Sequence, residues 1–408
     1  MGLLTSPVDR LSRPPGLVLL VSITMSGTFP IHLFVPALPG VVSEFHATAA
    51  AAQLTITLYI VGLSVGQLVY GPISDRFGRR PVLLLGLALY TVASVSAALS
   101  PSLGALVAAR VAEALGGCVG LVLGRAIARD GIAPHLVTRR LAILSLAMSL
   151  SPALAPMIGA QLAEAFGWRW VLGALSITSG LVVCVTALSL PETHAVRSQR
   201  PARAYALSYL ALLRSRAFTS HALGGAFATT SFFAFVAASP FIFIQQLGVS
   251  TRAFGFVYLC VILGLGCGSL AAKYIAGRMP ATRVLVSAAA IMIIASLGLL
   301  VAFFARVFTP AVVTFAMLVF IFGTGLASPF ALSGAINSDA AFAGSASGLY
   351  GFIQMGFGAL CTGLVALGGS NPAIPMILVL VVASVASLIA FSLIERDVAG
   401  RLRSRPCS

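Results

Sequence analysis

The stretch GPISDRFGRRP, residues 71–81, joins two long apolar runs and gathers three arginines and one aspartate in a single short connection. The runs on either side, 52–73 and 81–100, are each long enough to cross a bilayer as a helix, which takes about 20 apolar residues. A short basic connection between two such runs is typical of a loop on the cytoplasmic side of a membrane. Gly78 suits a tight turn, and we expect Asp75 to accept hydrogen bonds from the N-terminus of a neighbouring helix.

The composition extends this prediction to the whole chain. Hydrophobic residues make up 59% of the 408 residues and charged residues only 9%, with a mean hydropathy of +1.04. A soluble domain is about one quarter charged, so lipid must surround most of this chain. Twelve apolar runs are long enough to span a membrane as helices, and no strand-like alternation interrupts them. They cover residues 16–38, 52–73, 81–100, 103–125, 140–163, 168–190, 217–243, 253–275, 284–304, 309–332, 342–367 and 373–394.

The basic residues indicate the topology. Most of the 25 lysines and arginines lie before the first run, after the last, or in every second connection, and the positive-inside rule then places both termini in the cytoplasm. Topology and attraction to lipid head groups explain the net charge of +15 without a nucleic-acid partner. We therefore predict an all-α membrane protein of 12 transmembrane helices, with an N-terminal six-helix bundle (1–190), a cytoplasmic linker (191–216) and a C-terminal six-helix bundle with a basic tail (217–408). Within the linker, 205–213 is expected to form a short helix on the membrane surface.

The loop 71–81 resembles the G-x-x-x-D-R-x-G-R-R/K motif of the major facilitator superfamily. Other stretches are similar to its bicyclomycin/chloramphenicol-resistance branch of drug exporters: LFVPALP (33–39), RVAEALGG (110–117), ALAPMIGA (153–160), SPFIFIQQLGVS (239–250) and AGSASGLYGFIQMGFGAL (343–360). The resemblance implies the major facilitator fold and proton-coupled antiport of small, mostly hydrophobic drug-like compounds, by a monomer in a bacterial-type cytoplasmic membrane. It also implies a cytoplasmic gating motif made of Gly71, Asp75, Arg76, Gly78, Arg79 and Arg80.

The segment GRAIARD, 124–130, ends the fourth run beside this loop. We expect Arg125 and Asp130 to join the gating motif in a charge network, the alternative being that Arg125 only snorkels to lipid head groups. The fifth run contains SPALAPMIGAQ, 151–161, which is similar to the Gly-Pro motif of exporters in the superfamily through Pro152, Pro156 and Gly159. The alternative is an ordinary proline-kinked helix.

Arg110 and Glu113 lie deep in the fourth run and share one helix face, because residues three apart are neighbours on a helix. Each buried charge costs roughly 2.5–3.5 kcal/mol in a membrane, so the pair must face the bundle interior or a wet cavity. Relatives usually carry an acidic residue in helix 1 where this chain has His32, and commonly a glutamine where it has Glu113. We therefore predict that Glu113 carries the coupling proton, with Arg110 as its partner and His32 as a second titrating group. A purely structural ion pair and a hydrogen-bonded wall histidine are the alternatives.

The substrate pocket is harder to locate, because drug pockets are mostly apolar and aromatic. Its candidates are Tyr59, Gln67, Phe232, Phe233, Phe235, Tyr350 and Gln354, with Phe241 and Asn337 as further possibilities. No metal-ligand spacing and no nucleotide-binding loop are present, so the proton gradient is expected to drive transport without metal or cofactor. The polar residues in the spans are too few for an enzyme. Export of one endogenous metabolite, such as an amino acid or sugar, is the alternative function, and proton-coupled import is disfavoured by the helix 5 motif.

Overall fold

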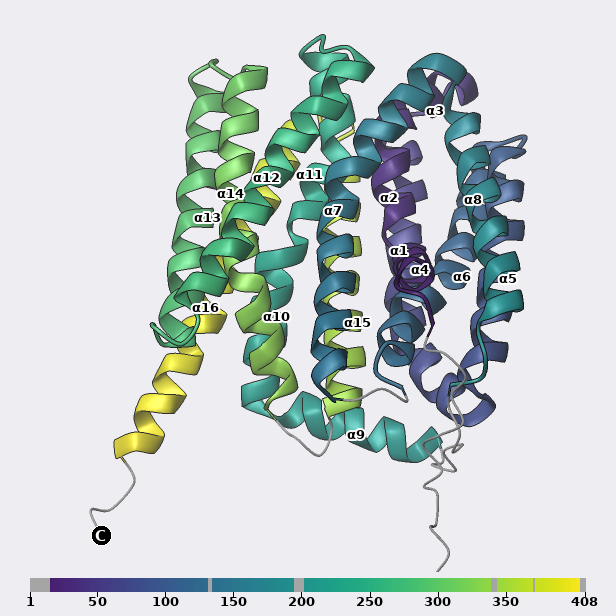
Figure 1. Ribbon diagram of the computed structural model, residues 1–408. Helices are drawn as coiled ribbons and strands as arrows, with labels where there is room; N and C mark the ends of the chain where they lie inside the picture. Colours follow the sequence, from purple (N-terminus) through teal and green to yellow (C-terminus); the bar gives the residue numbers. More distant parts are fainter. Residues whose placement is uncertain (1–14, 131–133, 194–201, 339–342, 370, 404–408) are drawn as a thin grey trace, which may run out of the picture.

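The computed structural model describes residues 15–130, 134–193, 202–338, 343–369 and 371–403, and within them the regular structure is helical (Figure 1). Eleven helices are long and apolar enough to cross a membrane, and there are 12 spans if one bent pair counts as a single span. The chain is thus a multi-pass helical membrane protein, as the composition predicted. The elements that precede the linker are α1 (Leu17–Met25), α2 (Phe29–Phe34), the short 3₁₀ turn η2 (Val35–Ala37), α3 (Leu38–Phe45), α4 (Ala49–Phe77), α5 (Arg79–Ala98), α6 (Leu103–Ile127), α7 (Pro134–Phe166) and α8 (Trp168–Ser189).

The linker contributes one helix, α9 (Ala202–Arg214), which runs across one end of the molecule, roughly perpendicular to the spans (Figure 1). The expected surface helix is therefore present. The elements that follow it are α10 (Arg216–Thr230), α11 (Phe232–Pro240), the π-helical turn η3 (Phe241–Gln246), α12 (Thr251–Ile275), α13 (Ala281–Phe304), α14 (Pro310–Ile336), α15 (Ala343–Ala366) and α16 (Ala373–Arg403). We call the parts before and after α9 the N-terminal and C-terminal halves. Their assignment to two separate bundles stays a prediction.

Two long helix pairs join the halves. Helix α4 packs against α15 and α7 packs against α12, while α5, α6 and α8 lie to one side and α13, α14 and α16 to the other (Figure 1). Small residues allow these approaches: a Cβ on Gly255 of α12 would lie 3.0 Å from Met157 Cα of α7. Close packing of this kind replaces the hydrophobic effect as the force between helices in lipid.

The first span differs from its prediction. The apolar run 16–38 was expected to form one helix, but α1 ends at Met25 and the chain bends by 59° before continuing from Phe29 to Phe45. Pro30, Pro36 and Pro39 supply no backbone N–H, so the i to i−4 ladder cannot run through this region. Hydropathy alone does not detect such a break. The break leaves backbone N–H and C=O groups of the N-terminal half without helical hydrogen-bond partners.

Candidate functional site

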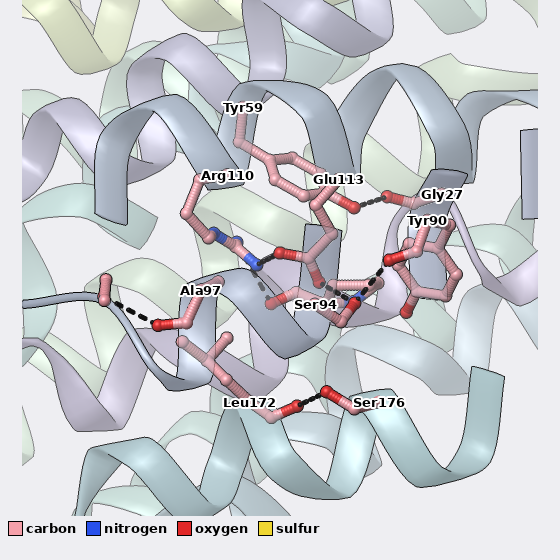
Figure 2. Close-up of polar contacts among 11 residues, drawn as sticks. Gly27, Tyr59, Tyr90, Ser94, Ala97, Arg110, Glu113, Leu172 and Ser176 are labelled. Atoms are coloured by element: carbon pink, nitrogen blue, oxygen red, sulfur yellow. Dashed lines mark hydrogen bonds and ion pairs between the residues drawn. The ribbon is translucent and has the colours of Figure 1, made fainter. Parts of the chain in front are cut away.

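Arg110 and Glu113, two of the charged residues of α6, contact each other. Arg110 Nη1 lies 2.7 Å from Glu113 Oε2, and both side chains are completely buried. Ser94 of α5 donates a hydrogen bond to the second carboxylate oxygen of Glu113 at 3.0 Å (Figure 2). The sequence left open whether these residues paired with each other or with separate partners, and the structure answers that they form one pair.

Arg110 also ties this pair to the broken first span. Its Nη2 donates to the carbonyl oxygen of Pro30 at 3.4 Å, and its guanidinium lies 4.9 Å from the ring centre of Phe34 and 4.2 Å from that of Tyr59. The Tyr59 hydroxyl in turn donates to Gly27 O, at the bend, at 3.0 Å (Figure 2). Cation–π contacts of this geometry contribute about 2 kcal/mol when desolvated. Arg110 therefore connects Glu113 to the first span through direct contacts.

His32 lies on the same span and reaches the other half. It is buried, and its Nδ1 is 3.3 Å from the hydroxyl of Tyr258 on α12. Its ring stacks at 6.4 Å on Phe233 of α11. His32 is thus a hydrogen-bonded residue at a contact between the halves, which is compatible with both roles that the sequence suggested.

At the α9 end of the molecule, three charged residues form a cluster. Arg79 Nη1 lies 2.7 Å from Asp75 Oδ1, and Arg79 Nε lies 3.5 Å from Asp130 Oδ2. Asp75 also accepts a hydrogen bond from the Tyr205 hydroxyl of α9 at 3.2 Å, and Asp130 accepts one from Thr193 at 3.2 Å. The expected charge network therefore exists, with Arg79 at its centre, and it contacts the linker helix.

Other members of the predicted motif lie elsewhere. Arg76 is exposed, and its guanidinium lies 5.5 Å from the ring of Phe77. Arg80 donates to Ala187 O at the end of α8, at 2.8 Å. Arg125 makes no ion pair with any described residue and instead lines a neighbouring cavity. The expectation that the network includes Arg76 and Arg125 was therefore wrong in this conformation. Gly71 has open space around it and also lines the cavity.

The expected role of Asp75 at a helix N-terminus belongs to another carboxylate. Glu192, just after α8, accepts from Arg79 N at 2.9 Å and from Arg80 N at 3.2 Å, at the start of α5. A carboxylate there satisfies free backbone N–H groups and complements the helix dipole. Gly78 is required beside it, because its φ is +102° and a Cβ would lie 2.6 Å from Glu192 Oε2. The sequence analysis missed Glu192, since nothing local relates it to a loop more than 100 residues earlier.

The exporter-like motif 151–161, called the helix 5 motif above, lies in α7 at the point where α7 meets α2 and α12. Pro152 and Pro156 lie inside α7 without ending it, and Gly159 faces the backbone of α2. A Cβ on Gly159 would lie 1.9 Å from Leu33 O, so only glycine permits this approach. In the same turn, Met157 and Ala160 lie beside Gly255 of α12, where an added Cβ would be 3.0 Å from Met157 Cα and 3.1 Å from Ala160 Cβ. The motif therefore allows α7 to pack closely on the first span and on the other half at once.

We expect Gly159→Ala to lower the yield of folded protein severalfold, because the new methyl group must displace the backbone of α2. Overpacking of this kind costs about 1–3 kcal/mol. The measurement is the monodisperse peak of detergent-solubilised protein, together with its thermal unfolding midpoint. Gly298→Ala is the matched control, since a Cβ there meets nothing within 4 Å. Equal yields from the two variants would contradict this explanation.

The substrate-pocket candidates lie in several different surroundings among the described residues. Phe232, Phe233 and Phe235 belong to an aromatic cluster with Tyr258 and the ring of His32, and Phe241 is buried nearby in sequence. Gln354 donates to the Thr229 hydroxyl at 2.6 Å and to the Tyr350 hydroxyl at 3.2 Å. Tyr59 belongs to the Arg110 site, and Asn337 is exposed at the end of α14. Only Gln67 lines the cavity of about 360 Å³ at the α9 end. Their role in substrate binding stays a prediction.

One buried partner could not be found by motif. Tyr258, the cross-half partner of His32, is fully buried and lies 226 positions along the chain from it. Within the described ranges, no group of three His, Cys, Asp or Glu side chains is placed to hold a metal ion. Three polar features therefore stand out in the described structure: the Arg110–Glu113 pair, the His32–Tyr258 contact and the charge cluster around Arg79.

A buried ion pair, a contact between halves and a charge cluster at one end, set on membrane-spanning helices, are features typical of membrane transporters. The family model described as Major Facilitator Superfamily matches residues 17–362. The chain belongs to this superfamily. Because it is a family of transporters, membership also confirms that the chain is not an enzyme.

Three relatives cover most of the chain. An uncharacterised transporter of the same superfamily type, YdgK of Bacillus subtilis, is 31% identical over 94% of this chain and 96% of its own. A bicyclomycin resistance protein homologue of Haemophilus influenzae is 25% identical over 90% and 93%. Multidrug resistance protein D of Escherichia coli is 28% identical over 85% and 87%. These matches confirm the family resemblance found in the motifs.

Among solved structures, a D-xylose–proton symporter superposes with a TM-score of 0.71, covering 91% of this chain and 96% of its own at 15% identity. This likeness confirms the fold.

Proposed function

We propose that this chain is a proton-coupled exporter of small, mostly hydrophobic drug-like molecules that works by alternating access in a bacterial-type cytoplasmic membrane, as a monomer. The drug-resistance names of the relatives and the helix 5 motif support export of drugs. The basic residues support the orientation, with the α9 end in the cytoplasm. No cofactor is needed, because the proton gradient supplies the work.

The observation that carries the proposal is the contact between Arg110–Glu113 and the first span. When Glu113 is charged, it holds Arg110 at 2.7 Å, and Arg110 holds Pro30 O and the ring of Phe34. A proton on Glu113 removes the charge that compensates Arg110, and the guanidinium must then find another partner. His32 lies two residues beyond Pro30 on the same short helix and contacts Tyr258 of the other half. Proton binding thereby biases how the halves meet, which is what coupling requires.

His32 is the second candidate for the proton. Histidine ordinarily titrates near neutral pH, and its contact with Tyr258 crosses between the halves directly. A charged His32 would act on that contact without involving Arg110.

The test is proton release on substrate addition in energised everted vesicles. We expect release with some members of a panel of phenicols, bicyclomycin, fluoroquinolones and lipophilic cations, and none in vesicles without the protein. Release by amino acids or sugars, and by none of the drugs, would favour the specific metabolite exporter. Proton-driven accumulation of substrate in right-side-out vesicles would identify an importer and overturn the proposed direction. If release survives the loss of Glu113, His32→Phe is the next variant to measure.

A further inference from the structure

In the described lining of the cavity at the α9 end, arginines outnumber carboxylates. Three arginines line it, Arg79, Arg125 and Arg129, beside one carboxylate, Asp75. Two more described carboxylates lie nearby: Asp130 is paired with Arg79, and Glu192 accepts from the backbone N–H groups of Arg79 and Arg80. Arg79 is held by both aspartates, whereas Arg125 and Arg129 form no ion pair with a described carboxylate.

Arg125 gives the stronger evidence for an anion at this cavity. Its Nε is buried, yet it has no hydrogen-bond partner among the residues that the structure describes. A buried guanidinium nitrogen left unsatisfied is costly, because nothing replaces the water it has lost. Arg125 lies near the end of α6, three residues beyond Val122, which also lines the cavity. The group is therefore held at the cavity, with donor capacity unused.

The rest of the lining suits an anion attached to an apolar body. Ser345 and Ser347 lie in the first turns of α15, whose N-terminus favours negative charge. Leu121, Ile336 and the ring-bearing side chains Tyr205 and Tyr209 contribute apolar surface. Mixed linings of this kind, apolar with a few placed polar groups, are typical of small-molecule sites.

The described membrane interior offers a cation no free carboxylate. Glu113 is the only buried carboxylate among the described residues, and it is already paired with Arg110. A positively charged substrate would therefore meet an excess of positive charge at the cavity and no free counter-charge beyond it. An isolated charge in such a low-dielectric interior is strongly disfavoured.

We propose that this cavity binds the anionic group of the transported molecule through Arg125 and Arg129, so that the substrates are aromatic or aliphatic carboxylates and phosphates in preference to lipophilic cations. The inference rests on the proposed export function, because it names the substrate class for that function. The anion enters from the α9 end, and its apolar body lies toward Leu121, about 12 Å along α6 from Glu113.

The experiment is calorimetric binding to the purified full-length chain in a neutral detergent, with three probes that share one ring system: 2-naphthoate, 2-naphthamide and 2-naphthylmethylammonium. We expect naphthoate to bind at least about tenfold more tightly than the other two, because charge-assisted hydrogen bonds to arginine favour the carboxylate. Equal affinity for the three probes, or preference for the ammonium, would overturn the proposal.

The variants test the arginines separately. Arg125→Gln and Arg129→Gln should each weaken naphthoate binding by about tenfold and leave naphthamide unchanged, while Arg125→Lys should keep most of the preference for the anion. Arg129 is exposed, so its replacement should not destabilise the fold. Arg278→Gln is the control: it removes one positive charge from an exposed position after α12 and should change nothing. An equal loss in this control would assign the effect to overall charge and refute the site.

Two further measurements complete the test. One distinguishes a lipid head group from a soluble substrate as the source of the anion, and the other distinguishes the anion site from the proposed antiport. Dihexanoylphosphatidylglycerol is compared with dihexanoylphosphatidylcholine. Arginine-dependent binding of the former, without binding of naphthoate, would make the cavity a lipid head-group site and overturn the substrate assignment. Naphthoate binding without proton release in vesicles would leave the anion site standing and refute the antiport. Proton release by cations, with no naphthoate binding, would refute the anion site and leave the antiport standing.

Discussion

Replacing Arg110 and Glu113 together by glutamine is expected to give a folded protein that no longer couples export to proton movement. The double variant removes the titrating carboxylate and its counter-charge at once, so no buried charge is left alone. Substrate-induced proton release in everted vesicles should fall by more than about tenfold, in line with coupling energies between linked sites. Substrate binding to the purified protein should persist, since neither residue lines the cavity.

The double variant is needed because Glu113→Gln alone has two effects. It removes the proton carrier, and it also leaves the fully buried Arg110 without its partner. Breaking one side of a buried pair costs about 3–5 kcal/mol, whereas replacing both sides by neutral groups is often tolerated. Loss of transport in the single variant would therefore not distinguish a coupling role from a structural one.

The two hypotheses for the pair then give opposite results. If Arg110 and Glu113 are only a structural ion pair, the folded double variant should still release protons when substrate is added. The matched control is Glu44→Gln with Arg169→Gln, an ion pair of 2.6 Å in the same half whose side chains are about 40% exposed. Arg169 also donates to Ala98 O and Ser100 O, and Glu44 accepts from Trp168 Nε1, so this control should lose some thermal stability. Its folded fraction should keep transport, because the pair lies away from the Arg110 site.

The sequence predicted the spans, the family and the placement of Arg110 and Glu113 on one helix face, because each of these depends on local patterns. Apolar length defines a span, and a spacing of three residues places two side chains on one helix face. It did not predict the bend after Met25, since a hydropathy average treats Pro30 and Pro36 as ordinary members of an apolar run. Nor did it predict the His32–Tyr258 contact, which depends on how two distant helices pack in three dimensions.

In the motif 71–81, the sequence could not predict which partner each arginine has. Arg76, Arg79 and Arg80 are indistinguishable as letters in a basic loop, but the structure gives each a different partner. Arg79 pairs with Asp75 and Asp130, Arg80 contacts the end of α8, and Arg76 lies exposed over Phe77. The pocket candidates lie in different surroundings for a related reason: an aromatic residue in a span gives no local sign of whether it faces lipid, core or substrate.

Arg79→Gln is therefore expected to abolish transport, while Arg76→Gln leaves it close to normal. Asp75 lies in the last turn of α4 and Asp130 just after the end of α6, where the helix dipoles disfavour negative charge. Arg79, only 12% exposed, contacts both carboxylates and offsets part of their negative charge. Without it the two acids repel each other and the contact of Asp75 with Tyr205 of α9 is weakened. The loss, about 1–2 kcal/mol for partly buried pairs, should shift the protein toward a state open at the α9 end.

Opening can be measured as the rate at which an impermeant maleimide labels Ser345→Cys, a cavity position, in everted vesicles of a variant whose six native cysteines are serines. We expect labelling to accelerate about five- to thirtyfold in Arg79→Gln, following the free-energy shift, and to stay unchanged in Arg76→Gln. The two substitutions remove the same charge from the same loop, so an effect on membrane orientation through the positive-inside rule would appear in both. Equal losses of transport would mean that the loop acts only through its charge, and that the cluster around Arg79 has no part in closing this end of the protein.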